Sequence, residues 1–131
     1  MKKEIGILGL GSMGSAIAFN LKKKYKVFGY DINKHKKIKS TKNFFITKNL
    51  KEIFLKTNTF IIIVLNENQC QKIFDTFIEI KKKLKISKNH TIINCTTVSP
   101  NWVRKVYSKL KKNNFEYIDC PISGGPNKAI N

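Results

Sequence analysis

The chain has 131 residues, which is enough for one domain with its own core but short for an enzyme built from two domains. Its formal net charge is +18, yet the 26 basic residues include a single arginine, Arg104, whereas proteins that read phosphates and guanines favour arginine forks, so we expect no nucleic-acid partner. No apolar run is long enough for a membrane span and the first residues lack a cleavable leader pattern, so we expect a cytoplasmic protein without a membrane partner.

Short apolar segments alternate with longer amphipathic ones, which is typical of βαβ units around a parallel sheet. We expect strands at residues 4–8, 26–30, 43–46, 59–65, 91–95 and 116–119. We expect helices at 12–24, 49–56, 69–84 and 100–112, with a short helical turn at 33–39. Lysines gather where helices should end, as at residues 22–24 and 111–112, and there they suit the helix dipole. The predicted fold is therefore α/β, a Rossmann-like doubly wound parallel sheet.

A glycine-rich turn follows the first expected strand and opens the first expected helix. It has the pattern GxGxxG and consists of Gly9, Leu10, Gly11, Ser12, Met13 and Gly14. In that context Gly9 permits the tight turn, Gly11 lets a pyrophosphate approach the backbone, and Gly14 lets the helix pack on the strand. The amides at the helix start then face the phosphates. The alternative is a glycine-rich turn in another kind of α/β protein.

Asp31 ends the second expected strand, about 20 residues after the first glycine, where an acid binds the adenosine ribose hydroxyls. A carboxylate at this position repels a 2′-phosphate, so the sequence favours NAD over NADP. Lys34, Lys36 and Lys37 lie nearby in the sequence, and their positive charges keep NADP from being excluded as the cofactor. Alternatively, Asp31 caps the turn that follows it.

The ends of the later strands are the other places where ligands bind in such folds. Leu65 and Asn66 end one expected strand, and Thr97 follows another. A hydroxyl there can contact the nicotinamide ribose, whereas Ser99 before a proline equally fits a helix N-cap. The segment 120–126, CPISGGP, follows the last expected strand, and its alternative reading is a tight surface turn.

The remaining reactive side chains predict no further site. Cys70, Cys95 and Cys120 form no CxxC pair, so we expect buried thiols and neither a disulfide framework nor a metal site. We expect His35 and His90 to be solvated, because His90 precedes its strand and His35 follows Asp31. Trp102 and the phenylalanines at helical spacing are expected in the core. Asp119 and Lys128 lie near the CPISGGP segment, but neither is expected to be catalytic.

Three segments, in order, resemble the β-hydroxyacid dehydrogenase family typified by 3-hydroxyisobutyrate and tartronate semialdehyde reductases. They are ILGLGSMGSAIAFNL, NCTTVSP and DCPISGGPNKA, and they extend over nearly the whole chain. The resemblance implies hydride transfer between NAD, with NADP not excluded, and a small 3-hydroxy acid. It implies that the three glycines cradle the pyrophosphate and that Asp31 holds the ribose. It further implies that Leu65, Asn66 and Thr97 touch the cofactor and that Ser123, Gly124 and Gly125 bind the substrate carboxylate.

The resemblance also implies parts that these 131 residues do not contain. Family members continue into another strand and an all-helical domain, which carries the catalytic lysine. We therefore expect residues 1–131 to form an NAD(P)-binding Rossmann domain that is incomplete at its C-terminal end, has no catalytic residue and is inactive as this fragment. The alternative is a non-catalytic NAD-binding module, or half of a split enzyme whose partner chain supplies the helical domain. A homo-oligomer also stays open.

Overall fold

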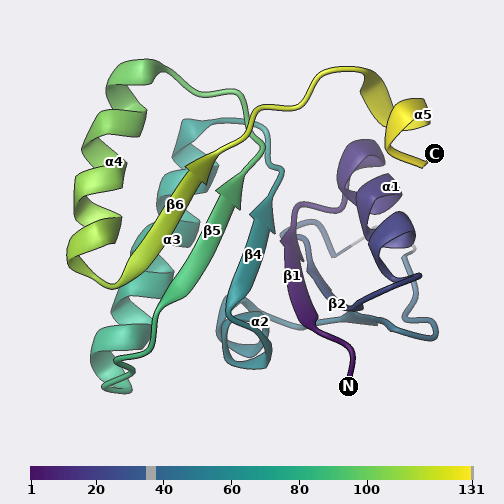
Figure 1. Cartoon of the computed structure of the whole chain (residues 1–131), viewed down its shortest axis with the longest axis horizontal. Coiled ribbons are helices and arrows are strands. Elements are labelled where there is room, and N and C mark those ends of the chain that lie inside the picture. Colours follow the sequence, from purple (N-terminus) through teal and green to yellow (C-terminus); the bar gives the residue numbers. More distant parts are fainter. Residues whose placement is uncertain (35–37, 131) are drawn as a thin grey trace.

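A computed structural model describes residues 1–34 and 38–130 and confirms the Rossmann-like α/β fold (Figure 1). Six parallel strands form one sheet in the order β3-β2-β1-β4-β5-β6. The chain first winds outward through β2 and β3 and then returns to place β4 on the other side of β1. The order therefore reverses between β1 and β4, as in doubly wound sheets. The strands are β1 Glu4–Leu8, β2 Lys26–Tyr30, β3 Phe44–Ile46, β4 Thr59–Ile62, β5 His90–Asn94 and β6 Phe115–Asp119.

Helices cover both faces of this sheet. They are α1 Ser12–Leu21, α2 Leu50–Lys56, α3 Glu67–Lys83, α4 Pro100–Lys112 and α5 Gly125–Ile130. In Figure 1, α1 and α5 lie together in front of the sheet, while α2 and α3 lie behind it. Within the described part of the chain, no helix is both long enough and apolar enough to cross a bilayer.

The structure contains all six expected strands and four of the expected helices, with shifted boundaries. The strand β4 stops at Ile62 rather than at residue 65, because the Val64 N–H donates to the Thr96 hydroxyl at 3.0 Å instead of extending the ladder. The helix α5 was not expected, since its short GPNKAI sequence is indistinguishable from a surface turn until it packs against α1. The expected helical turn at 33–39 includes residues 35–37, which lie outside the described residues.

Aromatic side chains form the larger core, between the sheet and the helices α2, α3 and α4. The rings of Phe54 and Phe60 lie 4.9 and 4.7 Å, respectively, from the ring of Phe77, between ring centroids. All three are at most 2% exposed. Trp102 is partly buried and packs against Phe74 at 5.7 Å. The expectation that these aromatic residues belong to the core is therefore confirmed.

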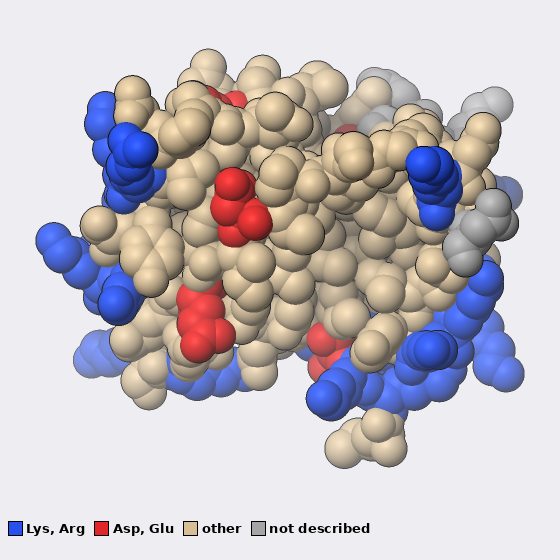
Figure 2. Space-filling model, turned by 45° about the horizontal axis from the view of Figure 1, so that its top comes forward, with Lys and Arg blue, Asp and Glu red and all other residues tan. Residues whose placement is uncertain are grey.

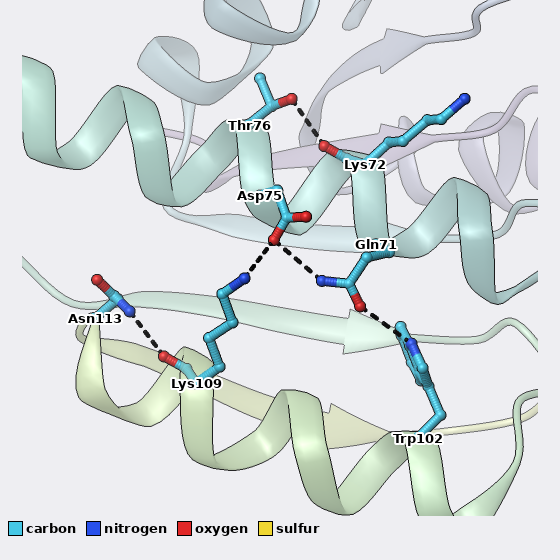
Figure 3. A network of polar contacts seen from close by, with 7 residues as sticks. All are labelled: Gln71, Lys72, Asp75, Thr76, Trp102, Lys109 and Asn113. Carbon is cyan, nitrogen blue, oxygen red and sulfur yellow. Dashed lines mark hydrogen bonds and ion pairs between the residues drawn. The ribbon is translucent and has the colours of Figure 1, made fainter.

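A polar network joins α3 to α4 at the edge of this core (Figure 3). The Asp75 carboxylate accepts from Lys109 Nζ at 2.7 Å and from Gln71 Nε2 at 3.0 Å, and the Gln71 carbonyl accepts from the Trp102 indole N–H at 3.1 Å. Partial desolvation alone would raise the pKa of Asp75, but the hydrogen bonds from Lys109 and Gln71 together lower it. Exposed ion pairs contribute little to stability. The role of the network is therefore to connect α3 and α4 at defined positions.

Lysines occupy the ends of three helices as expected, whereas α1 ends at Leu21 with no basic residue in its last turn, and residues 22–24 follow it. The last turns of α2, α3 and α4 carry basic residues, namely Lys56, Lys81–Lys83, and Lys109, Lys111 and Lys112. Figure 2 shows lysines around the margins of one face, whose middle carries mainly uncharged side chains with some acidic ones. On this face, the positive charge therefore lies around the margins rather than over the middle.

His90 is buried, which corrects the expectation that it is solvated. It is the first residue of β5 and is 1% exposed, and its ring stacks on Phe54 at 4.5 Å. Lys81 is buried beside it, and Lys81 Nζ donates to the carbonyl oxygens of Lys88 and Asn114 at 2.9 and 2.8 Å. Burial and then the Lys81 charge lower the pKa of His90 to about 4. This end of the sheet therefore holds a neutral imidazole.

The cysteines only partly match the expectation of buried thiols. Cys70 is fully buried against Asn94, whereas Cys95 is partly buried. Cys120 is exposed, which corrects the expectation, because it follows the edge strand β6.

We predict that His90 makes the stability of the protein depend on pH. Its folded-state pKa lies below the ordinary value of 6.5, so the unfolded chain binds the proton more readily. The stability is therefore complete above about pH 6.5 and falls as the pH drops toward 4. When the pH is lowered from about 7.5 to 4.5, the free energy of unfolding measured with urea should fall by about 2–3 kcal/mol more in the wild type than in the His90→Phe variant. Equal losses in the two proteins would contradict the burial of a neutral His90.

Candidate functional site

The carboxyl ends of the parallel strands meet at one edge of the sheet, from which the chain passes into α1, α3, α4 and α5 (Figure 1). In open α/β sheets, ligands bind at this edge, next to the point where the strand order reverses. Here that point lies between β1 and β4. The structure places the glycine turn 9–14, residues 65–66, Thr97 and residues 123–125 after strands that end at this edge.

The glycine turn brings the start of α1 directly against the strand ends. Gly9 has a φ of +97°, and a Cβ at this position would lie 1.8 Å from the Ile63 carbonyl oxygen. A Cβ on Gly14 would lie 1.9 Å from the Gly9 carbonyl oxygen. Because no side chain fits at either position, both glycines are required by this packing.

The N-terminus of α1 differs from those of the three following helices. Its N-cap residue is Gly11, which makes no side-chain capping bond, and its first turn has no acidic residue. In contrast, Asn49, Asn66 and Ser99 each accept from the backbone N–H three residues onward in α2, α3 and α4. Side-chain caps normally satisfy the first free amides of a helix. The positive end of α1 therefore faces the sheet edge without a side-chain cap, as an anion site requires.

Asp31 lies just after β2 and connects two turns. Its Oδ2 accepts from the Leu10 N–H at 2.7 Å, and its Oδ1 accepts from the Asn33 N–H at 2.8 Å. The alternative reading of Asp31 as a turn cap is thus part of what the structure shows. Asp31 also lines a hollow of about 360 Å³, whose walls comprise Leu10, Asp31, Asn33, Lys34, Ile38, Ile46, Thr47 and Lys48. One carboxylate therefore both holds the glycine turn and faces a space beside it.

The predicted contacts after β4 and β5 occupy different environments. The Leu65 side chain is 85% exposed, and the Asn66 side chain accepts from the Gln69 N–H as the cap of α3. Thr97 is exposed, whereas Thr96 is buried and its hydroxyl accepts from the Val64 N–H. Sequence reasoning missed Thr96, which ties the exits of β4 and β5 together. A hydroxyl residue directly after a buried strand is the signal that could have indicated it.

Ser99 and Glu67 connect the N-termini of α3 and α4. The Ser99 hydroxyl accepts from the Trp102 N–H, so the expected N-cap is present. The Ser99 backbone N–H donates to the Glu67 carboxylate at 2.6 Å, and this bond lowers the pKa of Glu67. The loops after β4 and β5 are therefore held at a fixed separation.

The Ser123-Gly124-Gly125 segment forms a turn between β6 and α5. Gly124 has a φ of +105° and Gly125 a φ of +72°, both in the left-handed region that side chains rarely adopt. The segment leads the chain from β6 across to α5, which packs against α1 (Figure 1). The predicted substrate turn thus leads to a helix that contacts the first helix of the glycine motif.

Asp119, Lys128 and a second hollow lie outside the candidate nucleotide site. Asp119 is exposed at the end of β6, and the Lys128 side chain lies beside Gly124. Among residues 1–34 and 38–130, no three His, Cys, Asp or Glu side chains are placed to hold a metal ion. A larger hollow of about 570 Å³ lies between α3 and α4, lined by Asp75, Ile78, Glu79, Lys82, Lys83 and Lys109. It is remote from the glycine turn, so we do not include it in the candidate site.

Comparisons with known proteins show which proteins this chain is similar to. A family model described as the NAD binding domain of 6-phosphogluconate dehydrogenase matches residues 4–131. The mitochondrial 3-hydroxyisobutyrate dehydrogenase of Drosophila melanogaster is 30% identical over 125 residues, which are 94% of this chain and 37% of that protein.

Solved structures show the same fold. A 3-hydroxyisobutyrate dehydrogenase from Mycobacterium tuberculosis, solved with L-serine, has a TM-score of 0.85 at 20% identity. The match covers 99% of this chain and 44% of the dehydrogenase chain. An imine reductase variant from Myxococcus stipitatus, in complex with NAD⁺, has a TM-score of 0.83 at 15% identity. The match covers 97% of this chain and 43% of the reductase chain. The chain therefore spans less than half the length of these proteins.

Proposed function

Since the chain belongs to the NAD-binding domain family of 6-phosphogluconate dehydrogenase, we propose that it is the nucleotide-binding part of an NAD-dependent dehydrogenase that acts on a small 3-hydroxy acid. The observation that carries this proposal is the uncapped N-terminus of α1, held by Gly9 and Gly14 where the strand order reverses. The names of the Drosophila and Mycobacterium relatives support the substrate class.

The cofactor contacts follow from the positions of the backbone donors. The amides of Gly11, Ser12, Met13 and Gly14 hold the pyrophosphate at the positive end of α1. Asp31 accepts the ribose hydroxyls while it keeps the Leu10 bond, because each carboxylate oxygen has more than one acceptor site. Leu65, Asn66 and Thr97 border the nicotinamide side. Bound NAD⁺ supplies the hydride acceptor.

The substrate carboxylate is assigned to the turn formed by Ser123, Gly124 and Gly125. Successive backbone N–H groups in a left-handed turn form a concave site for anions, and the positive φ values of both glycines favour this arrangement. The exposed Ser123 adds a hydroxyl donor. These residues orient the acid but do not transfer its hydroxyl proton.

We assign proton transfer to a group outside the described residues. A general base must lie within hydrogen-bonding reach of the hydroxyl. His90 is buried at the opposite edge of the sheet, where β5 begins, and the titratable groups near the turn include Asp119, Cys120 and Lys128. We favour a helical domain as the source of this group, either in continuation of the chain, in a partner chain or in a homo-oligomer. A module that binds NAD without turnover is the alternative.

The first test of this proposal concerns nucleotide preference. The chain should bind NAD at least about tenfold more tightly than NADP, because Asp31 repels a 2′-phosphate. Asp31→Asn removes the charge and should narrow the ratio of the two dissociation constants, as measured by titration calorimetry. Asp75→Asn, in the α3–α4 network, is the matched control and should leave the ratio unchanged. An unchanged ratio in Asp31→Asn would remove the assignment of Asp31 to the ribose.

The second test concerns turnover. With NAD and a panel of small 3-hydroxy acids, the chain alone should show negligible dehydrogenase activity, because loss of general acid–base catalysis typically costs about 10² to 10⁴ in rate. Fusion to the helical domain of a 3-hydroxyisobutyrate dehydrogenase should raise the rate. Robust turnover by the unaided chain, abolished by Asp119→Asn or Lys128→Met, would show that the catalytic group is already present.

A further inference from the structure

Two cysteines follow neighbouring strands at adjacent positions of the ladder. Cys95 comes directly after β5, and Cys120 comes directly after β6. The last paired residues of these strands are Asn94 and Asp119, and the Cys120 N–H donates to the Asn94 carbonyl at 2.8 Å. The next position therefore brings Cys95 opposite Cys120. Neighbouring strands are about 4.8 Å apart, which lies within the Cα separations that disulfides span.

Both thiols also lie on the same side of the sheet. The side chain of Asn94 is buried on the α3 side, where it contacts Cys70 Sγ at 3.7 Å and the Tyr117 hydroxyl at 3.0 Å. Because side chains alternate along a strand, Cys95 and Cys120 lie on the opposite face. The pKa of Cys95 responds to Cys120, as expected for two side chains that lie close together on one face. Cys70 is separated from them by the sheet itself.

The two thiols differ in accessibility, and the environment of Cys95 raises its pKa. Cys120 is exposed, so a reagent in solution can reach it. Burial, followed by the charge and hydrogen bonding of Cys120, raises the pKa of Cys95 to about 12. Cys95 therefore stays protonated in the reduced protein. Because only a thiolate is a good nucleophile, the exposed Cys120 is the thiol that a reagent reaches first.

We propose that Cys95 and Cys120 form an oxidisable dithiol, which a low-molecular-weight disulfide converts into an intramolecular disulfide. The Cys120 thiolate attacks one sulfur of the reagent, forms a mixed disulfide and releases the first small thiol. Cys95 then loses its proton to solvent and attacks the Cys120 sulfur, which releases the second small thiol. Two protein thiols are oxidised, and one reagent disulfide is reduced to two thiols.

This bond would connect the segments assigned to cofactor and substrate. Cys95 lies two residues before Thr97, and Cys120 lies three residues before Ser123. A link between them would fix the exits of β5 and β6 relative to each other. The inference goes beyond the proposed function, because the thiol chemistry requires neither bound nucleotide nor turnover.

The test is to incubate the chain with oxidised glutathione at about pH 8, quench with acid, alkylate in denaturant, and analyse intact mass and unreduced peptides. We expect two of the three thiols to be lost and a peptide linkage between positions 95 and 120. The intact mass should equal that of the reduced, unalkylated chain minus two hydrogen atoms plus one alkyl group. The Cys70→Ala control should form the same linkage. Cys95→Ser should instead keep a stable glutathione adduct on Cys120.

Three results would overturn the proposal. They are three free thiols after oxidation, a lasting glutathione adduct on wild-type Cys120 beside a free Cys95, and a linkage that includes Cys70 or joins two chains. The peptide map of the wild type distinguishes these outcomes, so the test does not depend on the folding of any variant.

Discussion

The close approach of α1 to the exits of β1 and β4 is the constraint on which the candidate site depends. A Cβ on Gly14 would lie 1.9 Å from the Gly9 carbonyl oxygen, and one on Gly9 would lie 1.8 Å from the Ile63 carbonyl oxygen. Only glycine lets the helix begin this close to the sheet edge. Asp31 then fixes the turn by accepting the Leu10 N–H. The uncapped helix start belongs to this turn, and Leu10 of the turn lines the hollow beside Asp31.

The two edges of the sheet have different physical roles. At the edge where β5 begins, His90 is stacked among aromatic rings, and Lys81 donates to two backbone carbonyls. Such buried polar groups stabilise one arrangement of the chain because each has a partner. At the opposite edge, exposed loops carry Leu65, Thr97 and Ser123. A packed scaffold at one edge of the sheet and exposed loops at the other is the usual arrangement where loops carry function.

The sequence was sufficient to predict features that depend on local pattern. The six strands followed from apolar periodicity, the glycine turn from its motif, and the Ser99 cap from the following proline. Features that depend on distant contacts were missed. His90 is buried because Phe54, from α2, covers it, and Thr96 accepts from the Val64 N–H in the loop after β4. The helix α5 packs against α1, and the pairing of β5 with β6, which places Cys95 and Cys120 after adjacent strands, depends on the strand order. None of these contacts leaves a periodic signal in the chain.

The most direct measurement of the central claim is an NMR titration of ¹⁵N-labelled chain with NAD, followed through the backbone amides. If α1 presents its N-terminus to the pyrophosphate, the largest shifts should fall on residues 11–14, with a second group near Asp31 and the hollow beside it. The amides around the α3–α4 hollow should not move. Shifts concentrated at Asp75 and Lys109, or no response of residues 11–14 at saturating NAD, would contradict the account.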